Sequence, residues 1–122
     1  MASDTEYPEH VLDLLMQVGA PFDPAARLRR MFGGYGIFCD GVMFGLIAQD
    51  VLFLKVDDTT RASFLEAGAE PFMYEKAGKL VEMSYVTVPD DAGENADELR
   101  PWAHMALAAA NRAKAAKPAK KR

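Results

Sequence analysis

The sequence predicts an α+β fold in which helices pack on an antiparallel sheet. Helical periodicity lies near both ends of the chain, and strand-like segments between them are joined by two-residue turns. A short helical segment divides the strands into two groups. The expected order of elements is therefore α-β-β-β-α-β-β-α. With 122 residues, of which 50% are hydrophobic and 26% charged, the chain has the size and composition of one globular domain.

The first helix is expected near the N-terminus, where Pro8 suits a first helical turn. Its apolar stripe has the spacing i, i+3, i+4, i+7 and consists of Val11, Leu14, Leu15 and Val18. Gly19 is expected to end this helix. Because Asp23 and Pro24 resemble an N-cap followed by a first-turn proline, a short helical turn is expected over Ala25–Arg30.

Three strands are expected next, over Met31–Cys39, Val42–Ala48 and Val51–Val56. Asp40-Gly41 is a hairpin signal, since a two-residue type I′ turn needs positive φ at both positions. Gln49-Asp50 is expected to form the second tight turn. Two tight connections between three strands predict an antiparallel meander.

A short helix is expected over Thr60–Ala67, with Phe64 and Leu65 facing inward. Two further strands follow, over Pro71–Tyr74 and Leu80–Val88. The segment between them contains Gly78 and is expected to form a turn.

The last helix is expected to begin after Asn95, because Glu98 three residues later completes a pattern typical of a capping box. Pro101 is expected to kink or restart the helix. Its apolar face is expected to consist of Trp102, Met105, Ala106 and Ala109.

Charge divides the chain into an acidic domain, residues 1–111, and a basic tail, residues 112–122. The first carries 8 basic and 18 acidic residues, a net charge of −10, and the second carries six basic residues. A body this acidic does not suit a large nucleic-acid surface, and the tail is expected to be disordered. The N-terminus lacks the features of a signal peptide, and one cysteine allows no intrachain disulfide, so a cytoplasmic protein is expected.

The glycine-rich segment 29–38 allows two interpretations. A phosphate-binding loop requires its glycines between a strand and a helix, whereas Gly33, Gly34 and Gly36 lead into a strand. We therefore expect these glycines to let Tyr35, Phe38 or Trp102 pack closely over the backbone. The preceding arginines leave a basic and aromatic binding surface as a second option.

No motif for catalysis or metal binding is recognisable. His10 and His104 are not accompanied by a ligand set at a familiar spacing. Cys39 lies at a turn, where it could be partly exposed, and its acidic neighbour Asp40 does not favour a reactive thiolate. Asp57 and Asp58 are explained by capping of the next helix. No enzyme activity and no cofactor are expected.

Several segments together closely resemble the N-terminal domain of the TfoX/Sxy family. The segments are 29–38, 41–48, 52–57, 71–74, 83–85 and 101–102, and the likeness covers about positions 7–114. The resemblance implies an α+β domain similar to type III secretion chaperones. It also implies regulation of natural competence, in which full-length members work with the cyclic-AMP receptor protein and carry a second, C-terminal helical domain. The family supplies no catalytic residues.

Three functions remain as alternatives. The first is a non-enzymatic interaction or regulatory module whose partner is a protein, with the transcription machinery as a candidate and a homodimer as a further option. The second is direct nucleic-acid binding through Arg27, Arg29, Arg30 and the tail. The third is an unrecognised small-molecule binder or enzyme. The predicted binding residues are Arg29, Arg30, Tyr35 and Lys55.

Overall fold

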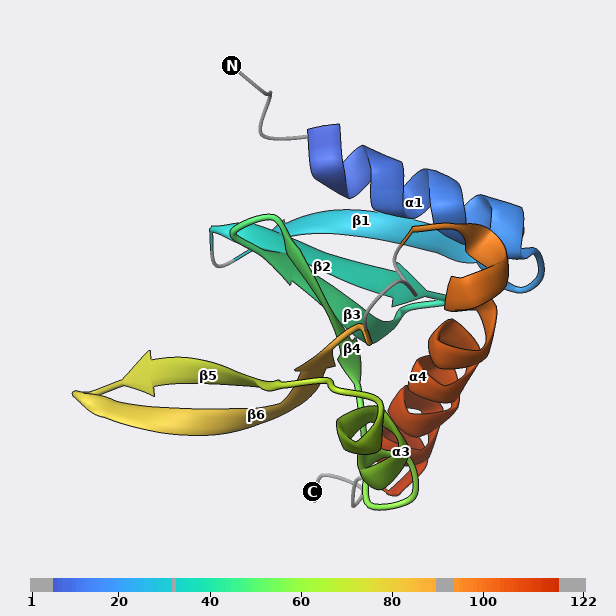
Figure 1. The fold of residues 1–122 in the computed structure, drawn as a ribbon. Helices are drawn as coiled ribbons and strands as arrows, with labels where there is room; N and C mark the ends of the chain where they lie inside the picture. Colours follow the sequence, from blue (N-terminus) through green and yellow to red (C-terminus); the bar gives the residue numbers. More distant parts are fainter. Residues whose placement is uncertain (1–5, 32, 90–93, 117–122) are drawn as a thin grey trace.

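The computed structural model describes residues 6–31, 33–89 and 94–116 (Figure 1). The helices are α1 (Glu6–Val18), α2 (Phe22–Ala25), α3 (Arg61–Glu66) and α4 (Ala96–Ala116). The strands are β1 (Ala26–Met31), β2 (Gly34–Cys39), β3 (Val42–Ala48), β4 (Val51–Lys55), β5 (Pro71–Lys76) and β6 (Lys79–Thr87). The predicted α+β class is confirmed, with one additional strand and one short helix before the predicted meander.

The six strands form one antiparallel sheet in the order β1-β2-β3-β4-β6-β5. Three of its connections are two-residue turns, at Asp40-Gly41, Gln49-Asp50 and Ala77-Gly78. All six of these residues have positive φ, as type I′ turns require. The three turns predicted from the sequence are therefore confirmed. The sheet edges are β1 and β5.

The helices pack on one face of this sheet. In Figure 1, α1 lies across the β1 end and α4 runs along β3 and β4. The core lies between these helices and the sheet. There the rings of Phe22 and Phe44 pack with their centres 5.1 Å apart, and the rings of Phe64 and Trp102 pack with their centres 4.7 Å apart. Its largest fully buried side chains include Leu15, Ile37, Leu54, Leu99 and Val86. Burial on this scale is the main driving force for folding.

The helical turn predicted over Ala25–Arg30 is wrong, because these residues belong mainly to β1. Arginine and leucine have good helix propensity, but β1 pairs with β2 at every position from Ala26 to Met31. Tertiary pairing therefore overrides local propensity. The predicted strand 31–39 is likewise divided into two strands, with Gly33 at a φ of 76° between them. A hairpin thus lies within the glycine-rich segment.

Three smaller predictions have mixed outcomes. Asn95 caps α4 as expected, since its Oδ1 accepts a hydrogen bond from the Glu98 N–H at 2.9 Å. Leu65 does not face inward, being 40% exposed. Helix α4 runs through Pro101 without restarting and reaches Ala116. Residues 112–116 of the expected tail are therefore helical, and the rest of the tail, 117–122, lies outside the described residues.

Candidate functional site

The side of the sheet opposite α1 and α4, which we call the open face, carries an apolar surface without a covering helix among the described residues (Figure 1). Strand register shows which side chains share this face. Arg27 pairs with Phe38, which pairs with Met43. A second row runs through Arg29, Gly36, Leu46, Phe53 and Thr87. Each row places side chains from adjacent strands on the same side of the sheet.

A groove of about 210 Å³ lies on the open face. All its lining residues are uncharged, and most are large and apolar. They are Met31, Gly34, Tyr35, Met43, Leu46, Ile47, Ala48, Phe72, Tyr74, Met83 and Tyr85. Tyr85 is buried in this wall of the groove, and its burial raises the pKa of its hydroxyl to about 12.

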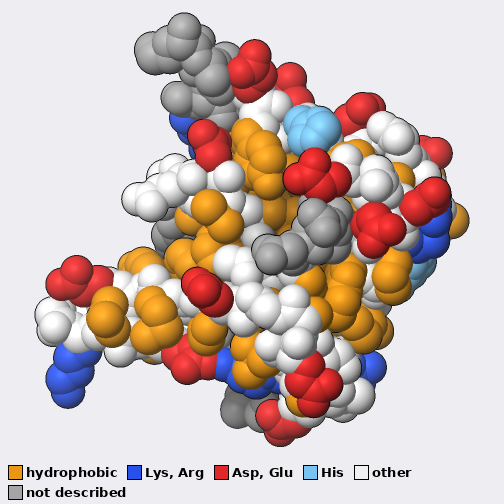
Figure 2. Space-filling view, in the orientation of Figure 1, with side chains coloured by type: hydrophobic (Ala, Val, Ile, Leu, Met, Phe, Trp, Pro, Cys, Tyr) orange, Lys and Arg blue, Asp and Glu red, His pale blue; other side chains and the backbone are white. Residues whose placement is uncertain are grey.

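The β5–β6 hairpin, which we call the arm, projects from the body of the domain (Figure 1). Its residues Phe72, Tyr74 and Met83 line part of the groove. Figure 2 shows hydrophobic side chains along the arm and in the angle between the arm and the rest of the sheet. Tyr74 is 43% exposed and Met73 46%, while Leu80 and Val81 are also exposed. Strand register puts Tyr74 and Val81 on the groove side of the arm and Met73 and Leu80 on the other side, so each side of the arm exposes two apolar side chains.

The glycines of segment 29–38 serve close packing. A Cβ at Gly36 would lie 2.6 Å from the Met31 sulfur and 2.9 Å from Cε1 of Phe38. A Cβ at Gly34 would lie 2.1 Å from the carbonyl oxygen of Ile47 on the adjacent strand. The prediction that Phe38 packs over bare backbone is confirmed, whereas Trp102 packs elsewhere, against Phe64.

The structure divides the predicted binding residues between the two faces. Strand register places Arg30 and Tyr35 on the helix side, where the Arg30 guanidinium donates a hydrogen bond to the Tyr35 hydroxyl at 2.6 Å, although Tyr35 also contributes to the groove lining. Arg29 is on the open face, 5.9 Å from the centre of the Phe38 ring. Lys55 shares the open face, with its ammonium 5.2 Å from the centre of the Tyr85 ring. Arg29 and Arg30 are both exposed but do not form a common surface.

Arg27 is also on the open face, but it is held near the start of β1. Its Nη1 donates hydrogen bonds to the carbonyl oxygens of Pro24 at 2.5 Å and Ala26 at 2.9 Å. The three arginines proposed as a nucleic-acid surface are therefore split, with Arg30 opposite the other two.

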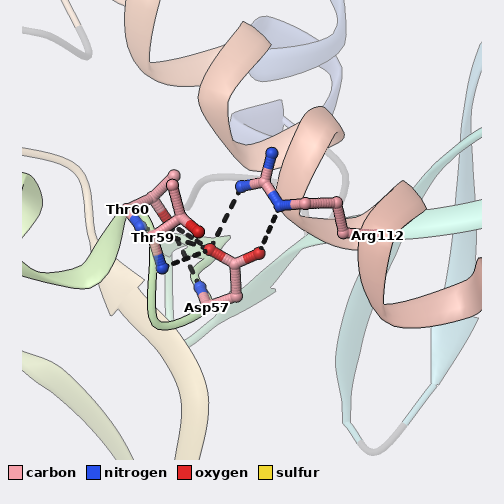
Figure 3. A network of polar contacts seen from close by, with 4 residues as sticks. All are labelled: Asp57, Thr59, Thr60 and Arg112. Carbon is pink, nitrogen blue, oxygen red and sulfur yellow. Dashed lines mark hydrogen bonds and ion pairs between the residues drawn. The ribbon is translucent and has the colours of Figure 1, made fainter. Parts of the chain in front are cut away.

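A polar network outside the groove joins the chain between β4 and α3 to the end of α4 (Figure 3). The two carboxylate oxygens of Asp57 accept hydrogen bonds from Arg112 at 2.7 and 3.1 Å. Asp57 also accepts backbone N–H bonds from Thr59 and Thr60 in the turn that leads into α3. The N-cap residue of α3 is Thr60, so Asp57 stabilises this turn and does not cap the helix as predicted. These contacts, above all the one with Arg112, lower the pKa of Asp57 to about 2. Each group has a structural partner, which indicates a stabilising network.

The remaining candidates give no site for chemistry. Cys39 is buried, contrary to the expected partial exposure, and burial followed by the charge of Asp40 raises the pKa of its thiol. His104 is exposed and packs its ring 5.2 Å from that of Phe22. Within residues 6–31, 33–89 and 94–116, no three His, Cys, Asp or Glu side chains are grouped as a metal site would require. No helix in the described part of the chain could span a bilayer.

The sequence alone had not indicated the groove. The sequence feature that indicates the groove is β3, which is apolar on both faces because Val42–Ala48 contains no polar residue. A strand of a one-sided sheet normally alternates apolar and polar residues. Continuous apolar character in a sheet whose helices cover only one face therefore marks a second buried or binding surface.

Family comparison agrees with this architecture. The model of the TfoX N-terminal domain matches residues 19–110, which include every strand of the sheet. The chain belongs to the TfoX N-terminal domain family. The TfoX N-terminal domain here is also similar to the DNA transformation protein TfoX1 of Aliivibrio fischeri (strain ATCC 700601 / ES114), with 32% identity over 62 residues. That alignment covers 51% of this chain and 30% of the relative.

Proposed function

We propose that this chain is a non-enzymatic regulatory module of the cytoplasm that acts by binding another protein through the open face. Its setting would be competence for DNA transformation, which is supported by the family and by the name of the relative TfoX1. The alignment covers only 30% of the relative, so the role proposed for this domain is limited to binding a partner protein.

The observation that carries the proposal is the apolar groove and its continuation along the arm. Phe72, Tyr74 and Met83 belong both to the arm and to the groove lining. Apolar surface of this kind is stabilised when a partner removes it from water. The lining offers a protein partner a large contact area but no converging set of charged groups for small-molecule chemistry.

Direct nucleic-acid binding is the weaker alternative. A nucleic-acid surface needs several cations close together, and Arg30 lies on the opposite face from Arg27 and Arg29. Strands β1 and β4 are separated by two strands, so Lys55 lies roughly 14 Å from the arginines at usual strand spacing. A strong, salt-sensitive affinity for duplex DNA that is lost with Arg29→Ala and Arg30→Ala alike would favour this alternative.

Two adjacent residues of the arm provide a matched test of protein binding. Tyr74 lies on the groove side, whereas Met73 pairs with Glu82, whose carboxylate forms an ion pair with Arg61 on the helix side. Both side chains are nearly half exposed, so replacing either with aspartate leaves the core intact. The purified chain and its Tyr74→Asp and Met73→Asp variants would be titrated against the cyclic-AMP receptor protein and RNA polymerase.

We expect binding to one of these proteins, at least tenfold weaker with Tyr74→Asp and nearly unchanged with Met73→Asp. A buried carboxylate without a partner would cause this loss, since burying an unpaired charge is costly. Absence of binding to both proteins at high micromolar concentration would contradict the transcriptional version of the proposal. Equal losses with both variants would contradict the assignment to the open face.

A further inference from the structure

We infer that the open face binds an acidic amphipathic helix of the partner protein. This inference rests on the proposed function and specifies the chemistry of its partner. Two features of the face support it: an apolar floor that suits the stripe of an amphipathic helix, and flanking cations on strands that carry no acidic residue.

The floor of the groove is rich in methionine. Met31 and Met43 lie over the bare backbone of Gly36, as the proximity of their sulfur atoms to its Cβ position shows. Met83 adds a third thioether from the arm side. Methionine side chains are unbranched and polarizable, so such a floor adapts to apolar side chains of different shape. This property suits a helix that inserts several apolar residues in a row.

The charge of the open face is opposite to that of the chain as a whole. The chain carries a net charge of −4, yet β1 to β4 contain no aspartate or glutamate. The charged residues of these strands on the open face are Arg27, Arg29 and Lys55. The nearest acidic residues along these strands, Asp40 and Asp50, lie in the turns. Carboxylates beside the partner's apolar stripe would therefore meet cations.

Arg29 is the cation best placed for this contact. It is exposed, and its guanidinium lies 5.9 Å from the centre of the Phe38 ring, within the range of a cation–π contact. The ring keeps the guanidinium close to the apolar face. A carboxylate approaching it can accept two parallel hydrogen bonds, which arginine donates more readily than lysine.

The position of the groove favours a helix over an added strand. A peptide that extends a sheet must pair with an edge, and the edges here are β1 and β5. The groove instead crosses the open face from Met31 on β1 to Tyr74 on β5, so it lies over the face of the sheet and does not run along either edge. Side chains that enter it come from above the sheet, as the stripe of an amphipathic helix does.

Two synthetic peptides provide the probe. Both are about 18 residues long, fluorescein-labelled and helical, with the same leucine and methionine stripe at i, i+3, i+4 and i+7. One carries glutamate on both flanks of the stripe, and the other carries lysine at the same positions. Fluorescence anisotropy with the full chain gives the affinity at about 50 mM and about 300 mM salt.

We expect the glutamate peptide to bind about tenfold more tightly than the lysine peptide at the lower salt concentration, with a smaller ratio at the higher one. Arg29→Glu should remove this preference. Arg30→Glu is the matched control, because Arg30 is adjacent and exposed but lies on the helix side. Circular dichroism of both variants checks that the sheet is retained.

Equal affinity for the two peptides, tighter binding of the lysine peptide, or binding of neither at millimolar concentration would overturn the inference. So would equal effects of Arg29→Glu and Arg30→Glu. Sedimentation that shows a dimer disrupted by Tyr74→Asp would assign the face to a second copy and would also overturn it. The proposed function is tested separately, by the titration with the partner proteins. It fails if Tyr74→Asp does not weaken the binding of those proteins.

Discussion

Replacing Gly34 with alanine tests the account of the glycine-rich segment most severely. The new Cβ would lie 2.1 Å from the carbonyl oxygen of Ile47, which is backbone of the paired strand β3. Because no side-chain rotation relieves this contact, β2 and β3 must separate locally. Overpacking typically costs about 1–3 kcal/mol, and a backbone clash belongs at the upper end. We expect a loss of about 3 kcal/mol in the free energy of unfolding.

Gly36→Ala is the comparison, two positions further along the same strand. Its Cβ would meet the ends of the Met31 and Phe38 side chains at 2.6 and 2.9 Å, and the methionine can move. Gly→Ala in a strand also regains roughly 0.5–1 kcal/mol of backbone entropy. A net loss of about 1 kcal/mol is therefore expected.

The assay is equilibrium unfolding in urea followed by the fluorescence of Trp102, which packs against Phe64 in the core. Gly34→Ala should shift the midpoint further than Gly36→Ala, at a similar slope. If Gly34→Ala is as stable as Gly36→Ala, the close approach of β2 to β3 at this position is wrong.

Two further predictions concern the polar network and the cysteine. Asp57→Ala should cost about 1–2 kcal/mol, since it removes the hydrogen bonds from the Thr59 and Thr60 N–H groups and an ion pair with Arg112. Folding lowers the pKa of Asp57 from 3.8 to about 2, so its contribution to the free energy of unfolding is present above pH 4 and is lost as the pH falls toward 2. On acidification, Asp57→Ala should therefore lose less stability than the parent chain. An Asp57→Ala profile that parallels the parent's would contradict this. Cys39 is buried with a raised thiol pKa, so a thiol reagent should modify it slowly in the folded chain and rapidly in urea, and equal rates would contradict its placement.

Most of the strands and helices could be predicted from the sequence because their signals are local. Asp40-Gly41 specifies a turn through the backbone conformation it adopts, and the stripe containing Val11 and Leu15 specifies a helix face. Strand β1 could not be predicted in this way. Its sequence, Ala26–Met31, favours a helix locally and becomes a strand through pairing with β2.

The candidate site was harder to predict because it depends on which face of each strand a residue occupies. Arg29 and Arg30 are adjacent in sequence, but successive side chains of a strand point to opposite faces, so the two arginines lie on different surfaces. The partner of Asp57 is not predictable for a different reason: the charge pattern places Arg112 in the tail, whereas α4 continues past it to Ala116. Contacts between residues this far apart in sequence require the fold itself.

The most direct measurement of the central claim is site-specific photocrosslinking in cells. A benzophenone amino acid at Met83 would report on the groove, and the same group at the exposed neighbour Ser84 would report on the other side of β6. We expect Met83 to give a crosslink to one protein, identified by mass spectrometry, that is lost with Tyr74→Asp and kept with Met73→Asp. No crosslink from Met83, or the same crosslink from both positions, would contradict a protein-binding role for the open face.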